Sequence, residues 1–268
     1  MKVARAVGQG FCITHKGWHI VFVLFIFNAI MRFFVAPVEA IPPLSRTLGE
    51  WGIIWFIFLI SILGLSYLGG GVLAFARNGI KQAIIRFKGF FGDCNRYFLR
   101  QLGLNAVVGV PLWIMVVLST VLLKGALMIA RRNWLTSAAL VSTSIILSIL
   151  AIAFFILFSF SWTIIVAKEA RIFKAIAQSF LFVGKRFAKV VGLLSLLCVI
   201  ALAIFLVVGI IYALLDYVLK KIGITNLERI LTELLGCILY AYFGLLSASS
   251  FMAYYLNNNE TPEQIGAA

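Results

Sequence analysis

Residues 172–215 read IFKAIAQSFLFVGKRFAKVVGLLSLLCVIALAIFLVVGIIYALL. From about residue 190 onward this stretch is an unbroken apolar run, and roughly 20 apolar residues are enough to cross the hydrocarbon of a bilayer as a helix. Its first half is different, because Lys174, Lys185 and Lys189 interrupt the apolar residues. The stretch therefore predicts a basic, amphipathic helix on the membrane surface that leads into a membrane-spanning helix.

The composition of the whole chain favours the same environment. Of its 268 residues, 63% are hydrophobic and 12% are charged, whereas soluble domains are about 45–50% apolar and about 25% charged. Similar runs occur at about 18–36, 51–76, 104–128, 135–166, 190–215 and 231–256. They do not alternate as the strands of membrane barrels do, so we predict six transmembrane helices. The fourth run is longer than a bilayer requires, so we expect it to tilt or to place its first turn in the interface.

A short signature recurs three times: an aromatic residue, a base five positions later, and a second aromatic two positions after the base. The copies are Phe11/Lys16/Trp18, Phe91/Arg96/Phe98 and Phe180/Lys185/Phe187. Two apolar runs separate successive copies, so all three would lie on the same side of the membrane. We therefore predict an all-α, polytopic membrane protein whose six transmembrane helices form three parallel repeats, each an interfacial helix plus a hairpin. The repeat units would be approximately 1–79, 80–167 and 168–256 of one membrane domain spanning 1–268, followed by a polar C-terminal tail at 257–268.

The second and third copies place apolar residues on one face of a helix and bases away from that face. The two apolar stripes are Ile80/Ile84/Phe87/Phe91/Phe98 and Ile172/Ile176/Phe180/Val183/Phe187. A helix with one apolar and one basic face lies along the headgroup layer. Gly103 and Gly192 follow these copies, and each predicts either a bend or the close approach of a neighbouring helix. Pro111, inside the third apolar run, predicts a kink.

Small residues recur at four-residue spacing within three of the apolar runs. They are Ser66/Gly70/Ala74 in the second run, Ser144/Ser148 in the fourth, and Gly244/Ala248 in the sixth, with Ala241 on another face of that run. In lipid, helices associate through close packing of small residues, because hiding leucine from hydrocarbon gains nothing. We therefore interpret these positions as helix–helix contacts and not as catalytic serines.

The bases are divided unequally between the two sides of the predicted membrane. Segments 1–17, 77–103 and 167–189, with the tail from 257, hold fifteen of the 23 Lys and Arg residues. Since Lys and Arg stay on the cytoplasmic side, we expect both termini in the cytoplasm. The net charge of +14 does not indicate nucleic-acid binding, because the bases form no separate soluble domain and no recognition motif accompanies them.

Residues that carry catalysis or hold metals are sparse. Arg32, Lys124 and Asp216 lie near the ends of apolar runs, and the middle of each run has essentially no titratable residue. His15 and His19 share a helical face, but no acid or cysteine is close enough in the sequence to argue for zinc. We predict no enzymatic activity and no cofactor. Ion-driven transport usually needs a charged residue at mid-membrane, so the sequence argues against a proton- or sodium-driven pump. It does not argue against the passage of a lipid or another apolar molecule.

Three segments carry a resemblance to a known family. They are Tyr67-Leu68-Gly69-Gly70-Gly71 with Gly79 downstream, Phe91 through Leu104, and Ser179-Phe180 through Gly192-Leu193. Through these segments the chain resembles a bacterial and archaeal group of six-span proteins of unknown function, which includes the membrane domain fused to some glycerophosphodiester phosphodiesterases. The acidic metal-binding constellation of the phosphodiesterase is absent from this sequence. The resemblance thus implies a multi-pass protein of a prokaryotic inner or plasma membrane and implies no activity.

Two functions remain open. The first is a scaffold or accessory subunit that binds anionic phospholipid, a membrane protein partner or a second copy of the chain. Its contact residues, which we name the basic collar, would be Lys16, Arg96, Arg100, Lys185, Arg186 and Lys189. The alternative is a permease or lipid-handling channel along the pseudo-threefold axis of the repeats.

Overall fold

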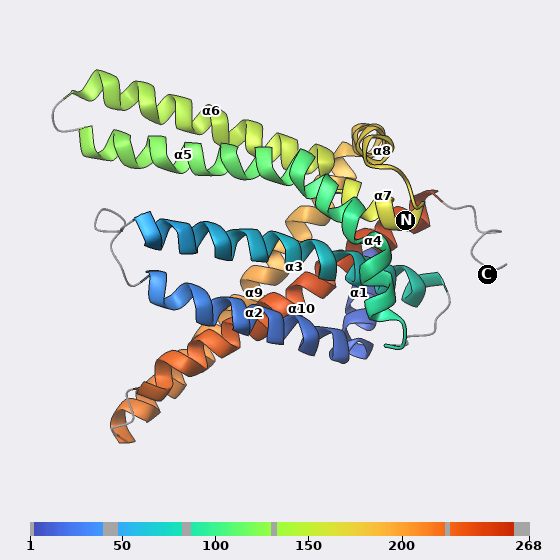
Figure 1. The fold of residues 1–268 in the computed structure, drawn as a ribbon, viewed down its shortest axis with the longest axis horizontal. Helices are drawn as coiled ribbons and strands as arrows, with labels where there is room; N and C mark the ends of the chain where they lie inside the picture. The colour runs from blue at the N-terminus through green and yellow to red at the C-terminus, as the bar shows by residue number, and fades with distance from the viewer. Residues whose placement is uncertain (1–2, 40–47, 82–86, 130–132, 223–225, 260–268) are drawn as a thin grey trace. The chain divides into compact units, whose positions relative to one another are not determined.

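The computed structural model describes residues 3–39, 48–81, 87–129, 133–222 and 226–259, and these ranges contain helices and no strand (Figure 1). The elements are α1 (Val3–Lys16), α2 (Trp18–Glu39), α3 (Leu48–Lys81), α4 (Phe90–Leu104), the π-helix η2 (Asn105–Gly109), α5 (Val110–Ile129), α6 (Trp134–Phe158), α7 (Ser161–Ala167), α8 (Ile172–Lys185), α9 (Phe187–Ile222) and α10 (Asn226–Asn259). Among the described residues, six stretches are long and apolar enough to cross a membrane: Trp18–Val35, Gly52–Lys81, Phe90–Ile129, Trp134–Ala167, Phe187–Leu214 and Leu231–Asn259. The prediction of a six-span, all-α membrane protein is confirmed.

The chain divides into two compact units. Unit 1 consists of Met1–Phe98 and Val191–Ala268, and unit 2 of Leu99–Val190. The borders of these units fall inside the second and third expected repeats, so the repeat arrangement stays a prediction. At the C-terminus, Asn257, Asn258 and Asn259 continue α10, and the polar tail beyond them lies outside the described residues.

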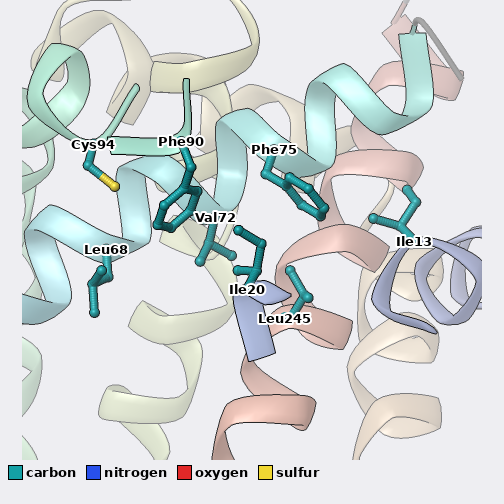
Figure 2. Close-up of a cluster of buried hydrophobic side chains, with 8 residues drawn as sticks. All are labelled: Ile13, Ile20, Leu68, Val72, Phe75, Phe90, Cys94 and Leu245. Atoms are coloured by element: carbon teal, nitrogen blue, oxygen red, sulfur yellow. The ribbon is translucent and has the colours of Figure 1, made fainter. Parts of the chain in front are cut away.

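The core of unit 1 lies toward one end of its long helices. α3 has 34 residues and is therefore about 51 Å long, more than the roughly 30 Å of bilayer hydrocarbon. Its buried residues Leu68, Val72 and Phe75 lie in its C-terminal half. Figure 2 shows them in one cluster with Ile13 of α1, Ile20 of α2, Phe90 and Cys94 of α4, and Leu245 of α10. One end of the spans is thus covered by α1 and by the first turns of α4.

Of the three small-residue stripes, the one in α10 is wrong at Gly244 only, because Ala248 packs against the core cluster of unit 1 and Ala241 is buried. Ser66, Gly70 and Ala74 of α3 are all buried, as a packing face should be. Gly244 of α10 is exposed, and a Cβ added there would meet nothing within 4 Å. The buried face of α10 passes through Ala241, as expected, and continues toward the C-terminus in larger side chains. Spacing of small residues cannot show which face of a helix meets protein, because lipid accepts either face.

Unit 2 is built on the α5–α6 hairpin, whose helices run side by side (Figure 1). Ser119 Oγ of α5 donates a hydrogen bond to the Ser144 carbonyl at 3.0 Å, and Ser144 Oγ donates to the Ser119 carbonyl at 2.8 Å. Ser148 Oγ lies 2.6 Å from Ser119 Oγ. The predicted contact through Ser144 and Ser148 is therefore confirmed, and these hydroxyls join the two spans by reciprocal hydrogen bonds.

The fourth apolar run contains a turn near its end. α6 stops at Phe158, a turn follows at Ser159 and Phe160, and the short helix α7 continues the chain. The expectation that this run tilts or places its first turn in the interface stays a prediction. The turn at Ser159 and Phe160 is fixed by tertiary contacts, because Phe160 is fully buried and its ring lies 4.9 Å from that of Phe182 in α8.

The third span is distorted just before its proline. Pro111 has no N–H to donate to the carbonyl four residues earlier, and η2 occupies the turn that precedes it. In η2 the Val110 N–H donates to the Asn105 carbonyl, and the Asn105 side chain accepts a 2.7 Å hydrogen bond from Trp162 Nε1.

Gly103 lies within α4 without a helix break, and an added Cβ would lie 2.5 Å from Ile172 Cδ1. Close approach, and not a bend, explains this glycine.

The first and third signature copies have the same local structure. α1 and α8 each contain 14 residues and end on the signature base, Lys16 or Lys185. One residue breaks the helix, and the next span begins on the signature aromatic, Trp18 or Phe187. Two 14-residue amphipathic helices thus lead directly into spans, as the sequence of these two copies predicts.

The second copy differs. Ile80 belongs to α3, Phe87 precedes α4, and Ile84 lies outside the described residues. The prediction that a single interfacial helix carries the whole stripe is therefore wrong. α4 continues without a break through the signature. At the position where the first copy breaks, Tyr97 is fully buried and accepts a 3.1 Å hydrogen bond from Arg77 Nη1 of α3. Anchoring against α3 favours a continuous helix here.

Candidate functional site

Three residues of the basic collar lie where α8 ends and α9 begins. Lys185 is the last residue of α8, Arg186 follows it as the C-cap, and Lys189 lies in the first turn of α9. Both lysines are exposed. Arg186 is half-buried, and its guanidinium carbon lies 4.9 Å from the centroid of the Phe182 ring, which is cation–π geometry. The junction opens the candidate span Phe187–Leu214, and bases beside a span are typically found at its membrane–water ends.

α8 is fixed to unit 2 by one face and exposes aromatic residues on the other. Ser179 is buried and donates a 2.8 Å hydrogen bond to the Leu157 carbonyl of α6. Phe173 and Phe180 are 77% and 52% exposed. The residues of the predicted apolar stripe therefore lie in two environments: Phe180 is exposed, whereas Val183 is buried within the protein. Exposed rings next to exposed bases are typical of a helix that lies in the membrane interface.

Lys16 repeats this arrangement in unit 1. It is exposed at the end of α1, and Trp18, two residues later, is 61% exposed. α1 is held along α10, where Asn257 Nδ2 donates a 2.9 Å hydrogen bond to Gln9 Oε1. The N-terminal helix and the end of the last span therefore lie together within unit 1.

The two remaining collar residues have protein contacts. The guanidinium carbon of exposed Arg96 lies 5.6 Å from the centroid of the Tyr97 ring. Arg100 Nη1 donates a 2.9 Å hydrogen bond to the carbonyl of Glu169, a residue whose φ of 52° is in the left-handed region. Arg100 therefore stabilises the linker between α7 and α8. By the division of the chain, Lys16 and Arg96 belong to unit 1 and the other four collar residues to unit 2.

Sequence reasoning missed an ion pair between two spans of unit 1. Arg32 Nε of α2 donates to Glu233 Oε2 of α10 at 2.8 Å, and Arg32 Nη2 lies 3.5 Å from Glu233 Oε1. The two side chains are 40% and 26% exposed. Each lies inside an apolar stretch, near its end. The residues are 201 positions apart, so only the folded chain shows the pair.

The Arg32–Glu233 pair predicts a testable coupling between α2 and α10. Reversing one charge, by Arg32→Glu or Glu233→Arg, is expected to lower the free energy of unfolding by about 1 kcal/mol, because the pair is partly exposed and screened. The double reversal should recover most of that loss. Thermal unfolding in one detergent would measure all four proteins. A double variant no more stable than the weaker single variant would contradict the coupling.

A groove of about 350 Å³ runs along the α5–α6 hairpin and is lined mostly by apolar residues. Its hydroxyl groups come from Ser119, Thr120 and Ser148. Each hydroxyl is hydrogen-bonded, Thr120 and Ser148 to carbonyls four residues earlier in their own helices. The groove therefore presents a surface that suits a hydrocarbon chain and offers no unsatisfied hydroxyl to a polar ligand.

Among the described residues, no three His, Cys, Asp or Glu side chains come close enough together to hold a metal ion. Comparison of the chain with models of protein families, with curated proteins and with solved structures finds no match. The resemblance to the phosphodiesterase-associated membrane domains therefore stays a prediction. The chemistry of the site has to be argued from its own residues.

Proposed function

We propose that this protein is a non-enzymatic membrane scaffold or accessory subunit that binds anionic phospholipid through its basic collar. One observation carries the proposal. At Lys16-Gly17-Trp18 and again at Lys185-Arg186-Phe187, an amphipathic helix ends on an exposed lysine and a span begins on an exposed aromatic. The same three-part junction on two separate helices supports a common use at the membrane surface.

The energetics favour anionic lipid as the ligand. Each base near a negatively charged membrane surface contributes roughly 1 kcal/mol of attraction. Lys185, Arg186 and Lys189 lie within five consecutive residues and would together favour an anionic over a neutral headgroup by about 100-fold. We expect these bases at the cytoplasmic leaflet, where anionic lipids are abundant and where Lys and Arg accumulate. The contact between α1 and the end of α10 supports both termini lying on one and the same side of the membrane.

Neutralising the junction tests the proposal. The variant Lys185→Gln/Arg186→Gln/Lys189→Gln would be reconstituted in nanodiscs of phosphatidylcholine and phosphatidylglycerol, extracted in mild detergent and analysed by native mass spectrometry. We expect its preference for phosphatidylglycerol to fall by about 10- to 100-fold. Lys124→Gln/Lys221→Gln, which changes two exposed bases outside the collar, should keep the preference.

Two results would overturn the proposal. One is an unchanged lipid preference in the triple variant. The other is that the wild-type protein shows no lipid preference and instead binds an acidic protein through the same three bases. The collar would then be a protein-binding surface.

A lipid-handling channel is the second candidate, and the groove on the α5–α6 hairpin is the observation that favours it. An acyl chain could lie against Val116 and Ile152 over the hydrogen-bonded serines. Transbilayer movement of a fluorescent phospholipid in proteoliposomes, slowed by Ser148→Phe, would support this function. Equal movement in protein-free liposomes would exclude it.

A further inference from the structure

Five rings from two distant segments form a continuous series on unit 1, which we name the aromatic platform: Trp18, His19, Phe87, Phe90 and Phe91. The rings of Trp18 and His19 stack with centroids 4.0 Å apart, and those of His19 and Phe87 are 6.2 Å apart. The Phe87 ring lies 5.9 Å from both Phe90 and Phe91, which are themselves 5.3 Å apart. Through these ring contacts, the first residues of α2 lie beside the first turn of α4.

The platform is both exposed and firmly held. Trp18, Phe87 and Phe91 are 61%, 40% and 49% exposed, whereas Phe90 is buried in the core cluster of Figure 2. Gly89 has a φ of +100°, which an L side chain rarely adopts, and this turn brings Phe87 beside the rings that open α4. The rings therefore keep a fixed arrangement while one side of the series stays open.

Two cations flank the rings. Lys16 precedes Trp18 by two residues, and Lys88 directly follows Phe87; both lysines are exposed. Two candidate spans begin at the platform, one at Trp18 and one at Phe90. This location is the membrane–water boundary, where aromatic rings contact the glycerol region and lysines reach phosphate groups.

We propose that the aromatic platform binds one anionic phospholipid. Lys16 and Lys88 bind its phosphate-bearing headgroup, and the rings of Trp18, Phe87 and Phe91 pack on its glycerol and upper acyl region. The pairing of positive charge with exposed rings at the bilayer boundary matches an amphiphile, since a free phosphate would leave the rings unused. The inference rests on the proposed function and names a specific site for it in unit 1.

The test uses the full chain in phosphatidylcholine nanodiscs that contain a photoactivatable phosphatidylglycerol, with lipid adducts mapped by mass spectrometry. We expect adducts on the peptides around residues 16–19 and 87–91. Lys16→Gln/Lys88→Gln should weaken this labelling by about 30-fold, and Phe87→Ala/Phe91→Ala by about fivefold. Melting temperatures of the variants would confirm that they fold.

A matched control removes a different pair of exposed, contacting rings from α2. Phe33 and Phe34 lie at its other end with ring centroids 6.0 Å apart, and Phe33→Ala/Phe34→Ala should leave platform labelling unchanged. Three results would each overturn the inference: equal labelling by photoactivatable phosphatidylcholine, unchanged labelling in both platform variants, or competition by soluble glycerol phosphate. The triple variant of the α8–α9 junction should keep platform labelling. Failure of the junction proposal is therefore read from the lipid preference of the triple variant, and failure of this inference from the labelled peptides around residues 16–19 and 87–91.

Discussion

Replacing Gly10 with leucine is expected to separate α1 from α10 and to lower the melting temperature of the protein in detergent by about 6–12 °C. A Cβ at Gly10 would overlap Ser250 Oγ and would lie 3.1 Å from the Ser250 nitrogen and 3.2 Å from the Leu246 carbonyl oxygen. Backbone atoms cannot move aside without displacing α10. Overpacking of this kind costs about 3 kcal/mol, and each kcal/mol shifts the melting temperature by roughly 2–4 °C in a chain of this size.

Gly8→Leu is the matched control for this prediction. Gly8 lies on the same helix, and a Cβ there would meet nothing within 4 Å. Leucine also favours helix over glycine by roughly 0.8 kcal/mol, so Gly8→Leu should leave the melting temperature unchanged or slightly raise it. An equal loss of stability in both variants would show that the contact between α1 and α10 does not stabilise unit 1.

The six spans could be predicted because the signal for a span is local. Any run such as 190–215 must be a helix in lipid, whatever it packs against. Small residues predicted the contact faces of α3 and α6, but the partner that each helix packs against could not be predicted, because apolar side chains face lipid and protein alike. Gly10 and Ser250 are 240 positions apart, and nothing in either neighbourhood identifies the other as its partner.

The candidate site shows the same division between local and long-range information. The aromatic–base–aromatic signature identified Lys16 and Lys185 from local sequence, and the structure places both at exposed helix ends beside a span. The aromatic platform was not predicted, because Trp18 belongs to the first signature copy and Phe91 to the second. Their connection passes through Phe87 and His19, whose positions depend on the turn at Gly89 and on the packing of α4 against α3.

Replacing Tyr97 with alanine is expected to destabilise the protein by about 3 kcal/mol, comparable to the loss of other large buried aromatic residues. Tyr97 is fully buried, and its hydroxyl accepts a 3.1 Å hydrogen bond from Arg77 Nη1. Tyr97→Phe keeps the ring and removes only the hydroxyl, so it should lose about 1 kcal/mol. Thermal unfolding of both variants in one detergent would measure the difference.

The same pair of variants tests why the signature breaks the helix at Gly17 and Arg186 but not at Tyr97. If burial of Tyr97 against α3 keeps α4 continuous, Tyr97→Ala should speed hydrogen exchange at the amides of residues 98–101 by about tenfold or more. Tyr97→Phe should leave most of their protection, since the buried ring remains. Unchanged exchange in Tyr97→Ala would mean that local sequence, and not the contact with α3, determines the continuous helix. The residues of each signature copy would then determine by themselves whether the helix breaks there or continues.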